Sequence, residues 1–171
     1  FRTELRELIT IATLAEQTPE SPLRFGYANI GRARTEGGEL NARIRVWGGM
    51  WLDLGYGLTH AIDLDANRLL EGRAMHRITG RLSGRIRPLG LEASVRAAWN
   101  GPRWFYPDLD GNGTLDAIRV AGYTDVDARL SRRFFTYVEA FVGIKNALDA
   151  GDPLYLPLPP RQVYGGLSVE L

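Results

Sequence analysis

The sequence predicts an all-β fold, an antiparallel sheet of about eight strands. Apolar and polar residues alternate with a period of two in seven segments of the 171-residue chain. Such alternation is typical of strands that have one polar and one apolar face. The 20 glycines and 9 prolines fall mostly between these segments, where an all-β chain needs its turns.

The clearest predicted strand covers 40–47, "LNARIRVW", where the alternation is strict. Six further segments show the same alternation, at 50–60, 74–86, 91–99, 124–133, 136–147 and 161–171. Short turns such as "WGG" and "RPLG" alternate along the chain with long loops at 63–72, 102–119 and 148–160. A period of two that is sustained over seven segments is a strong strand signal.

The segment "TELRELITIATLAE", residues 3–16, is ambiguous. Leu5, Leu8, Ile9 and Ala12 have helical spacing, and Thr3 is a suitable N-cap. Local propensity alone therefore slightly favours a helix over a strand.

The polar side of the predicted strands carries charges along its whole length. A soluble sandwich or barrel with a buried apolar face would show this pattern. The alternation of short and long connections and the aromatic residues near strand ends favour a transmembrane β-barrel, which has short periplasmic turns and aromatic girdles. We therefore expect a lumen lined by Arg43, Arg77, Arg81, Arg96 and Arg129.

These arginines have two candidate roles. They would attract an anionic ligand, or they would form cross-strand ion pairs. The pattern favours ion pairs, because carboxylates lie on the same predicted face at Glu39, Asp53, Glu92, Asp125, Asp127 and Glu139.

Composition excludes several functions. The net charge of +1 gives no basic patch for nucleic acid, and the absence of cysteine excludes disulfides and thiolate metal sites. Neither a nucleophile elbow nor a phosphate-binding or dinucleotide-binding loop is present, so we expect no enzyme and no certain cofactor.

One loop has the spacing of a calcium site. In "DLDGNGTLD", Asp108, Asp110, Asn112, Thr114 and Asp116 occupy alternate positions, and Gly113 allows a sharp turn. Calcium prefers such oxygen ligands. Arg119 stands where the motif has a bidentate glutamate, so the sequence predicts weak binding at best, and a solvated turn is the alternative.

The segment "YANIGRARTEGGEL", residues 27–40, resembles the C-terminal barrel region of TonB-dependent outer-membrane receptors. The resemblance continues, in the same order, through "LLEGRAMHR", "YTDVDARLSRRF", "VGIKNALDAGDP" and "PPRQVYGGLSVEL". It implies that residues 3–16 form a strand. The chain departs from the family in ending at Leu171 instead of an aromatic residue.

The resemblance implies that residues 1–171 are the C-terminal part of a barrel of about 22 strands, without the plug domain. The implied function is uptake of a scarce nutrient complex, such as a siderophore or cobalamin, across the bacterial outer membrane. The implied partners are the bilayer, the remaining barrel and plug, and a TonB-type energy-coupling protein. The lumen arginines would then pair with plug carboxylates or attract an anionic substrate. The alternatives are a self-contained small outer-membrane barrel with a structural or adhesive role and a soluble β-barrel that binds a ligand.

Overall fold

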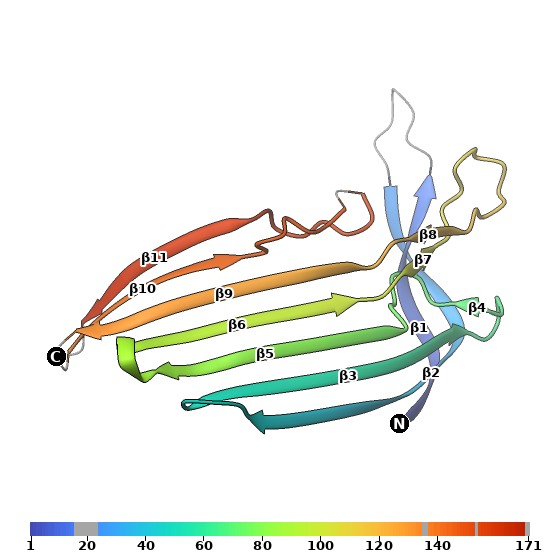
Figure 1. Cartoon of the computed structure of the whole chain (residues 1–171). Helices are drawn as coiled ribbons and strands as arrows, with labels where there is room; N and C mark the ends of the chain where they lie inside the picture. Colours follow the sequence, from blue (N-terminus) through green and yellow to red (C-terminus); the bar gives the residue numbers. More distant parts are fainter. Residues whose placement is uncertain (16–23, 135–136, 153, 170–171) are drawn as a thin grey trace.

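The computed structural model describes residues 1–15, 24–134, 137–152 and 154–169. They form an antiparallel sheet in which each strand pairs with the next one in the following order (Figure 1). The order is β1 (Arg2–Ala15), β2 (Arg24–Arg45), β3 (Met50–Asp63), β5 (His76–Ile86), β6 (Leu91–Asn100), β9 (Tyr123–Phe134), β10 (Val138–Lys145) and β11 (Gln162–Val169). The predicted all-β, antiparallel sheet of about eight strands is therefore confirmed.

The segment at residues 3–16, which is ambiguous from sequence, begins as a strand, β1. The resemblance implied a strand there, whereas the helical spacing favoured a helix. β1 pairs with β2 along its length, from Arg2 opposite Glu36 to Ala15 opposite Arg24. This long-range pairing satisfies the backbone of the segment and overrides a weak local preference for helix.

The predicted bounds need three corrections. β2 begins at Arg24, so the predicted strand at 40–47 is only the last part of a longer strand. The predicted loop at 63–72 contains β4 (Arg68–Leu69), which pairs with β3. The predicted loop at 102–119 contains a hairpin of β7 (Arg103–Phe105) and β8 (Ile118–Val120). These strands lack a sustained alternation, because Gly37 and Gly38 interrupt β2 and the others are very short.

The connections divide between the two ends of the sheet. The turn between β2 and β3 and the turn between β5 and β6 lie at one end, and the long connections β3–β5, β6–β9 and β10–β11 lie at the other (Figure 1). The β5–β6 turn is a 3-10 helix, η1 (Arg87–Leu89), that ends at Gly90 with φ of 61°. A left-handed residue closes this turn, and glycine adopts that conformation without steric cost.

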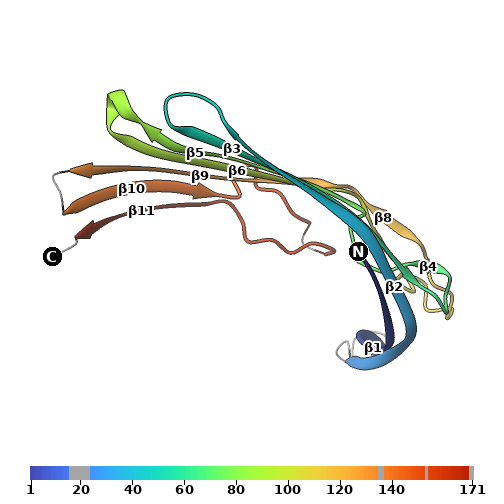
Figure 2. The same ribbon diagram turned by 90° about the horizontal axis from the view of Figure 1, so that it is seen from below.

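The sheet is curved and open. Figure 2 shows that β1 and β2 turn away from the surface formed by β9, β10 and β11. Among the described residues, β1 and β11 are the edges of the sheet and each has one strand neighbour. No helix in the described part of the chain has the length and apolarity that crossing a membrane requires.

The side chains that the structure describes, which exclude those of residues 7–30, form almost no core. The buried hydrophobic residues among them are the alanines Ala33, Ala61 and Ala98. A soluble barrel or sandwich of this size would bury large aliphatic side chains. The fold therefore depends on some other medium or surface to cover its apolar side chains.

Candidate functional site

The strand register separates the side chains into two faces, because directly opposite residues of an antiparallel pair point to the same side. One lateral row runs across five strands through Arg43, Asp53, Arg81, Arg96 and Asp127. We call its side of the sheet the polar face. It carries all of the arginines that the sequence singled out, namely Arg43, Arg77, Arg81, Arg96 and Arg129.

Three of these arginines form ion pairs between neighbouring strands. Arg43 pairs with Asp53. Arg96 reaches two carboxylates, 3.3 Å from Asp127 and 3.5 Å from Asp125. The guanidinium of Arg129 lies 3.2 Å from Glu139, and a second arginine, Arg133, lies 3.9 Å from the same carboxylate. Cross-strand pairs of this kind hold the register of a sheet whose polar side chains stay in water.

Arg77 and Arg81 differ from the other three. Both side chains are exposed, and within the described residues neither forms an ion pair. Arg81 stands in the charged row between Asp53 and Arg96, whose own ion pairs run to Arg43 and to the β9 carboxylates. These two arginines are therefore polar-face cations that are available to another molecule.

The opposite, apolar face is uncovered. Its central row runs through Ile44, Leu52, Leu82, Val95, Ala128, Ile144 and Val163. Leu40 on β2 and Leu167 on β11, which lie on the same face, are 71% and 75% exposed. In a soluble barrel these side chains would pack together in a closed centre with the arginines outside. A continuous apolar surface of this extent is typical of contact with lipid.

Two aromatic rings lie against the sheet on its polar face near β11. Tyr164 lies opposite Gly143 and Phe141 lies opposite Gly166, so each ring covers the open space above a glycine on the neighbouring strand. Arg129 lies 4.6 Å from the ring centre of Phe141, and Lys145 lies 5.9 Å from that of Tyr164. Together with Gln162 these residues line a shallow groove of about 470 Å³. The alternation identified this polar side, but it did not reveal the rings, because their packing over glycines depends on cross-strand register.

Replacing Gly143 by alanine is expected to lower the free energy of unfolding by about 1–2 kcal/mol, because the new methyl group overlaps the ring of Tyr164. Gly57 is the matched control, since it is also a strand glycine and a methyl group there meets no atom within 4 Å. The free energy of unfolding of both variants is measured by urea unfolding in liposomes. Equal stability of Gly143→Ala and Gly57→Ala would contradict the packing role of Tyr164.

The β10–β11 loop is held by one buried asparagine. The Asn146 amide donates to the carbonyls of Ala150 at 2.8 Å and Pro159 at 2.9 Å, and its oxygen accepts from the Ala150 N–H at 2.8 Å. The Asn146 N–H donates to Asp127 at 3.1 Å, which joins the loop to the charged row. Asn146 is 7% exposed and has φ of 46°, so both its side chain and its backbone suit this position. No motif in the sequence singles out this residue.

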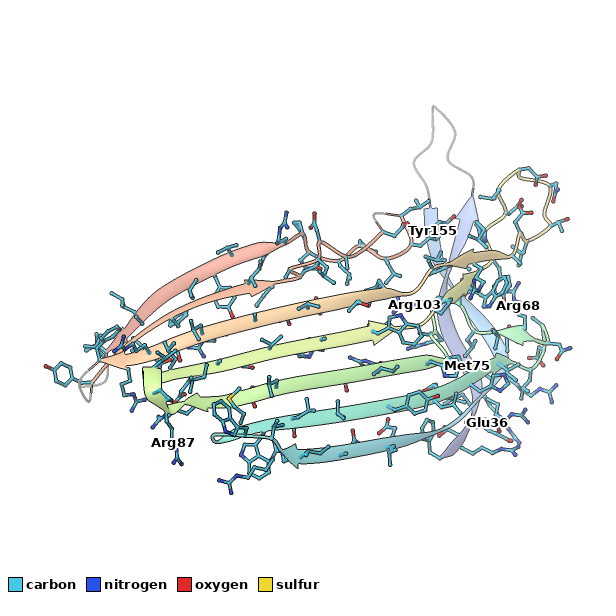
Figure 3. All side chains as sticks on the ribbon, viewed as in Figure 1. Glu36, Arg68, Met75, Arg87, Arg103 and Tyr155 are labelled. Carbon is cyan, nitrogen blue, oxygen red and sulfur yellow. The ribbon has the colours of Figure 1, made fainter. Side chains whose placement is uncertain are left out.

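Aromatic rings and arginines gather at the end of the sheet that carries the long connections. Phe105 and Tyr155 have ring centres 5.1 Å apart, Arg68 lies 4.5 Å from the ring centre of Tyr106, and Arg103 lies 5.1 Å from that of Tyr123. Figure 3 places Arg68, Arg103 and Tyr155 together at this end. Because three separate connections contribute, sequence spacing alone could not have assembled the cluster.

The predicted calcium loop lies between β7 and β8. Its side-chain oxygens accept hydrogen bonds from the loop's own backbone: Asp108 from the Gly113 N–H at 2.8 Å, Asn112 from Thr114 at 2.7 Å and Asp116 from Leu109 at 3.2 Å. Asp110 accepts from the Asn112 amide at 2.7 Å. In the described part of the chain, no three His, Cys, Asp or Glu side chains are grouped as metal ligands. The calcium site stays a prediction.

Solved structures share this fold at low sequence identity. The pyoverdine outer-membrane receptor FpvA of Pseudomonas aeruginosa matches with a TM-score of 0.72 and 16% identity, over 99% of this chain and 26% of that one. The siderophore receptor PirA of Acinetobacter baumannii matches with a TM-score of 0.72 and 14% identity, over 98% and 28%. The ferric enterobactin receptor PfeA of P. aeruginosa matches with a TM-score of 0.69 and 12% identity, over 98% and 28%.

The chain thus spans about a quarter of the length of the receptors that it matches. Comparison with curated proteins gave no match. The family model described as "TonB dependent receptor-like, beta-barrel" matches residues 1–147. Because this match covers most of its length, the chain belongs to the TonB-dependent receptor-like β-barrel family of bacterial outer-membrane proteins.

Proposed function

We propose that the chain supplies barrel wall and outer loops to an outer-membrane transporter for a scarce nutrient complex such as a siderophore or cobalamin. The division of one sheet into an uncovered apolar face and an ion-paired polar face carries this proposal. A transporter wall has lipid on one side and a hydrated interior on the other, and this sheet suits both. Family members are receptors and transporters rather than enzymes, and we propose no catalytic role.

In this proposal the polar face lines the barrel interior. Arg77 and Arg81 then face a plug domain or the passing substrate, and plug carboxylates are the partners that complement them. The ion pairs of Arg43, Arg96 and Arg129 belong to the wall itself. A TonB-type protein would act on the plug, and the wall described here would stay in place.

In this proposal, the substrate first contacts the end of the sheet that carries the long connections. Aromatic faces beside guanidinium groups, as at Arg68 with Tyr106 and Arg103 with Tyr123, suit a planar or anionic ligand. Among the similar structures, FpvA is bound to pyoverdine and PirA is a siderophore receptor. These features favour a ferric siderophore over cobalamin.

Growth under iron limitation tests the proposed function. A strain without the protein is expected to lose growth on one of a panel of ferric siderophores supplied as the sole iron source, and the restored gene is expected to recover it. Cobalamin-dependent growth is the parallel measurement. Unchanged growth on every siderophore together with unchanged cobalamin uptake would overturn the proposal.

The self-contained small barrel is not favoured. A closed barrel of eight strands requires hydrogen bonds between its first and last strands. In the described chain, β1 pairs only with β2 and β11 only with β10. The uncovered apolar face likewise disfavours the soluble ligand-binding barrel.

We also propose that the loop of Asp108, Asp110, Asn112, Thr114 and Asp116 binds calcium weakly. Its carboxylates already accept backbone hydrogen bonds, so calcium must compete with these bonds and millimolar concentrations are expected to be needed. Hydrogen exchange of residues 108–116 should slow at about 5 mM calcium and not at equal magnesium. The variant Asp110→Asn should remove the effect. Unchanged exchange at this calcium concentration would exclude the site.

A further inference from the structure

One charged residue lies on the apolar face in the part of the sheet toward the short turns. This part of the face begins at the row through Leu40, Tyr56 and Ile78 and ends at the short turns. Within it, Arg132 is the only charged side chain that the described strands place on the apolar side. The register places Arg132 on the apolar face, since it stands opposite Leu91 on β6 and Ala140 on β10. Arg133, the next residue, points to the polar face and reaches Glu139.

Arg132 lacks an acidic partner among the described residues. Its side chain is exposed, and its guanidinium lies 5.2 Å from the ring centre of Phe134, the last residue of β9. Phe134 is itself 42% exposed on the same face. The arginine therefore sits two residues from the strand end, with an aromatic ring between it and the turn.

This depth matches the boundary between hydrocarbon and headgroups. An arginine on the lipid side of a barrel costs about 2–4 kcal/mol at the midplane and about 0–1 kcal/mol near the interface. Exposed aromatic residues mark the same end of the sheet, with Trp47 in the β2–β3 turn 79% exposed. From this position the long side chain of Arg132 reaches the headgroups.

A second cation lies nearby. Arg87 begins η1, directly after Ile86, and Ile86 is opposite Leu91, which is opposite Arg132. Two strand spacings, about 10 Å, therefore separate the two positions laterally. Figure 3 shows Arg87 at the turn end of β5, with its side chain extending from the sheet.

We propose that Arg132, with Arg87 beside it, binds the phosphate of an anionic phospholipid in the leaflet at the short-turn end. A guanidinium binds phosphate oxygens in bidentate geometry, and the hydrocarbon beside it excludes competing water. Phosphatidylglycerol is the headgroup class that fits, because its phosphate charge is not neutralised by an amine. The site rests on the outer-membrane location of the chain and does not depend on which cargo is transported.

Thermal unfolding in nanodiscs tests the site. The protein is extracted from outer membranes with every chain that co-purifies, and it is reconstituted in phosphatidylcholine with and without phosphatidylglycerol. Phosphatidylglycerol is expected to raise the midpoint temperature of thermal unfolding of the wild-type protein by about 2–4 °C. The variant Arg132→Gln should lose this rise, and Arg132→Lys should keep most of it. Salt at 0.5 M should reduce the rise, since it screens the attraction.

Arg133→Gln is the matched control, because it removes the same charge one residue away on the other face and leaves the shorter Arg129–Glu139 pair in place. A rise that persists in Arg132→Gln, or that is lost equally in Arg133→Gln, would overturn the proposal. If Arg132→Gln does not assemble, the wild-type protein decides the question: mass spectrometry of its bound lipid should show enrichment of phosphatidylglycerol over the bulk mixture. Binding in bulk proportion would refute the site, whatever the outcome of the siderophore growth assay.

Discussion

Replacing Val95 by lysine is expected to lower the free energy of unfolding in the membrane by about 2–4 kcal/mol. Val95 lies in the middle of β6 on the apolar face, between Leu82 and Ala128, and it is 45% exposed. An ammonium group at this depth must remain among acyl chains or distort the bilayer to reach water. The quantity to measure is the urea dependence of unfolding in liposomes, together with the amount of folded protein in outer membranes.

Ser94→Lys provides the matched control. Ser94 precedes Val95 on β6 but points to the polar face, opposite Ser83 and Arg129. Arg129 is already neutralised by Glu139, so a further cation there should change the stability by no more than about 0.5 kcal/mol. If both lysines were tolerated equally, the apolar face would not contact lipid and the transporter assignment would fail.

Replacing Asn146 by alanine is expected to destabilise the β10–β11 loop by about 2–4 kcal/mol. Three side-chain hydrogen bonds are lost at about 1 kcal/mol each, and alanine is strained at a φ of 46°. Hydrogen exchange of residues 146–161 should accelerate, with smaller changes in β5 and β6. Proteolytic nicking within this loop is a second measurement.

Asn146→Gly separates the two causes. Glycine adopts the positive φ without strain, so this variant should lose only the hydrogen bonds and should fall between wild type and Asn146→Ala. Loss of the loop should also loosen Asp127, which accepts from the Asn146 N–H. Wild-type exchange rates in Asn146→Ala would show that the loop is held by other contacts.

Periodicity predicted the sheet because it reports a property of single strands. Along β6, the alternation of Glu92, Ser94 and Arg96 with Ala93 and Val95 identifies a strand and both of its faces without any knowledge of its neighbours. The same alternation grouped the five arginines on one side. It could not decide which side meets water, since a buried face and a lipid face have the same composition.

The helical spacing of apolar residues predicted the wrong structure for β1, because local helix propensity is weak compared with pairing to another strand. Leu5 and Leu8 fit a helix, but the backbone of β1 is bonded to β2 across its whole length. The resemblance gave the correct structure for this segment. Neither kind of reasoning found β4, β7 or β8, since segments of two or three residues carry no measurable period.

Alternation along single strands was sufficient, by itself, to determine the all-β class, the polar and apolar faces, and the division between turns and long loops. Register between strands is a property of pairs, and only the tertiary structure decided it. That register matched Arg96 to its two aspartates and left Arg77 and Arg81 unpaired among the described residues. It also set Tyr164 over Gly143 and placed Arg132 on the apolar face near the short turns, between Leu91 and Ala140. Contacts of this kind join residues distant in the chain, so no local pattern encodes them.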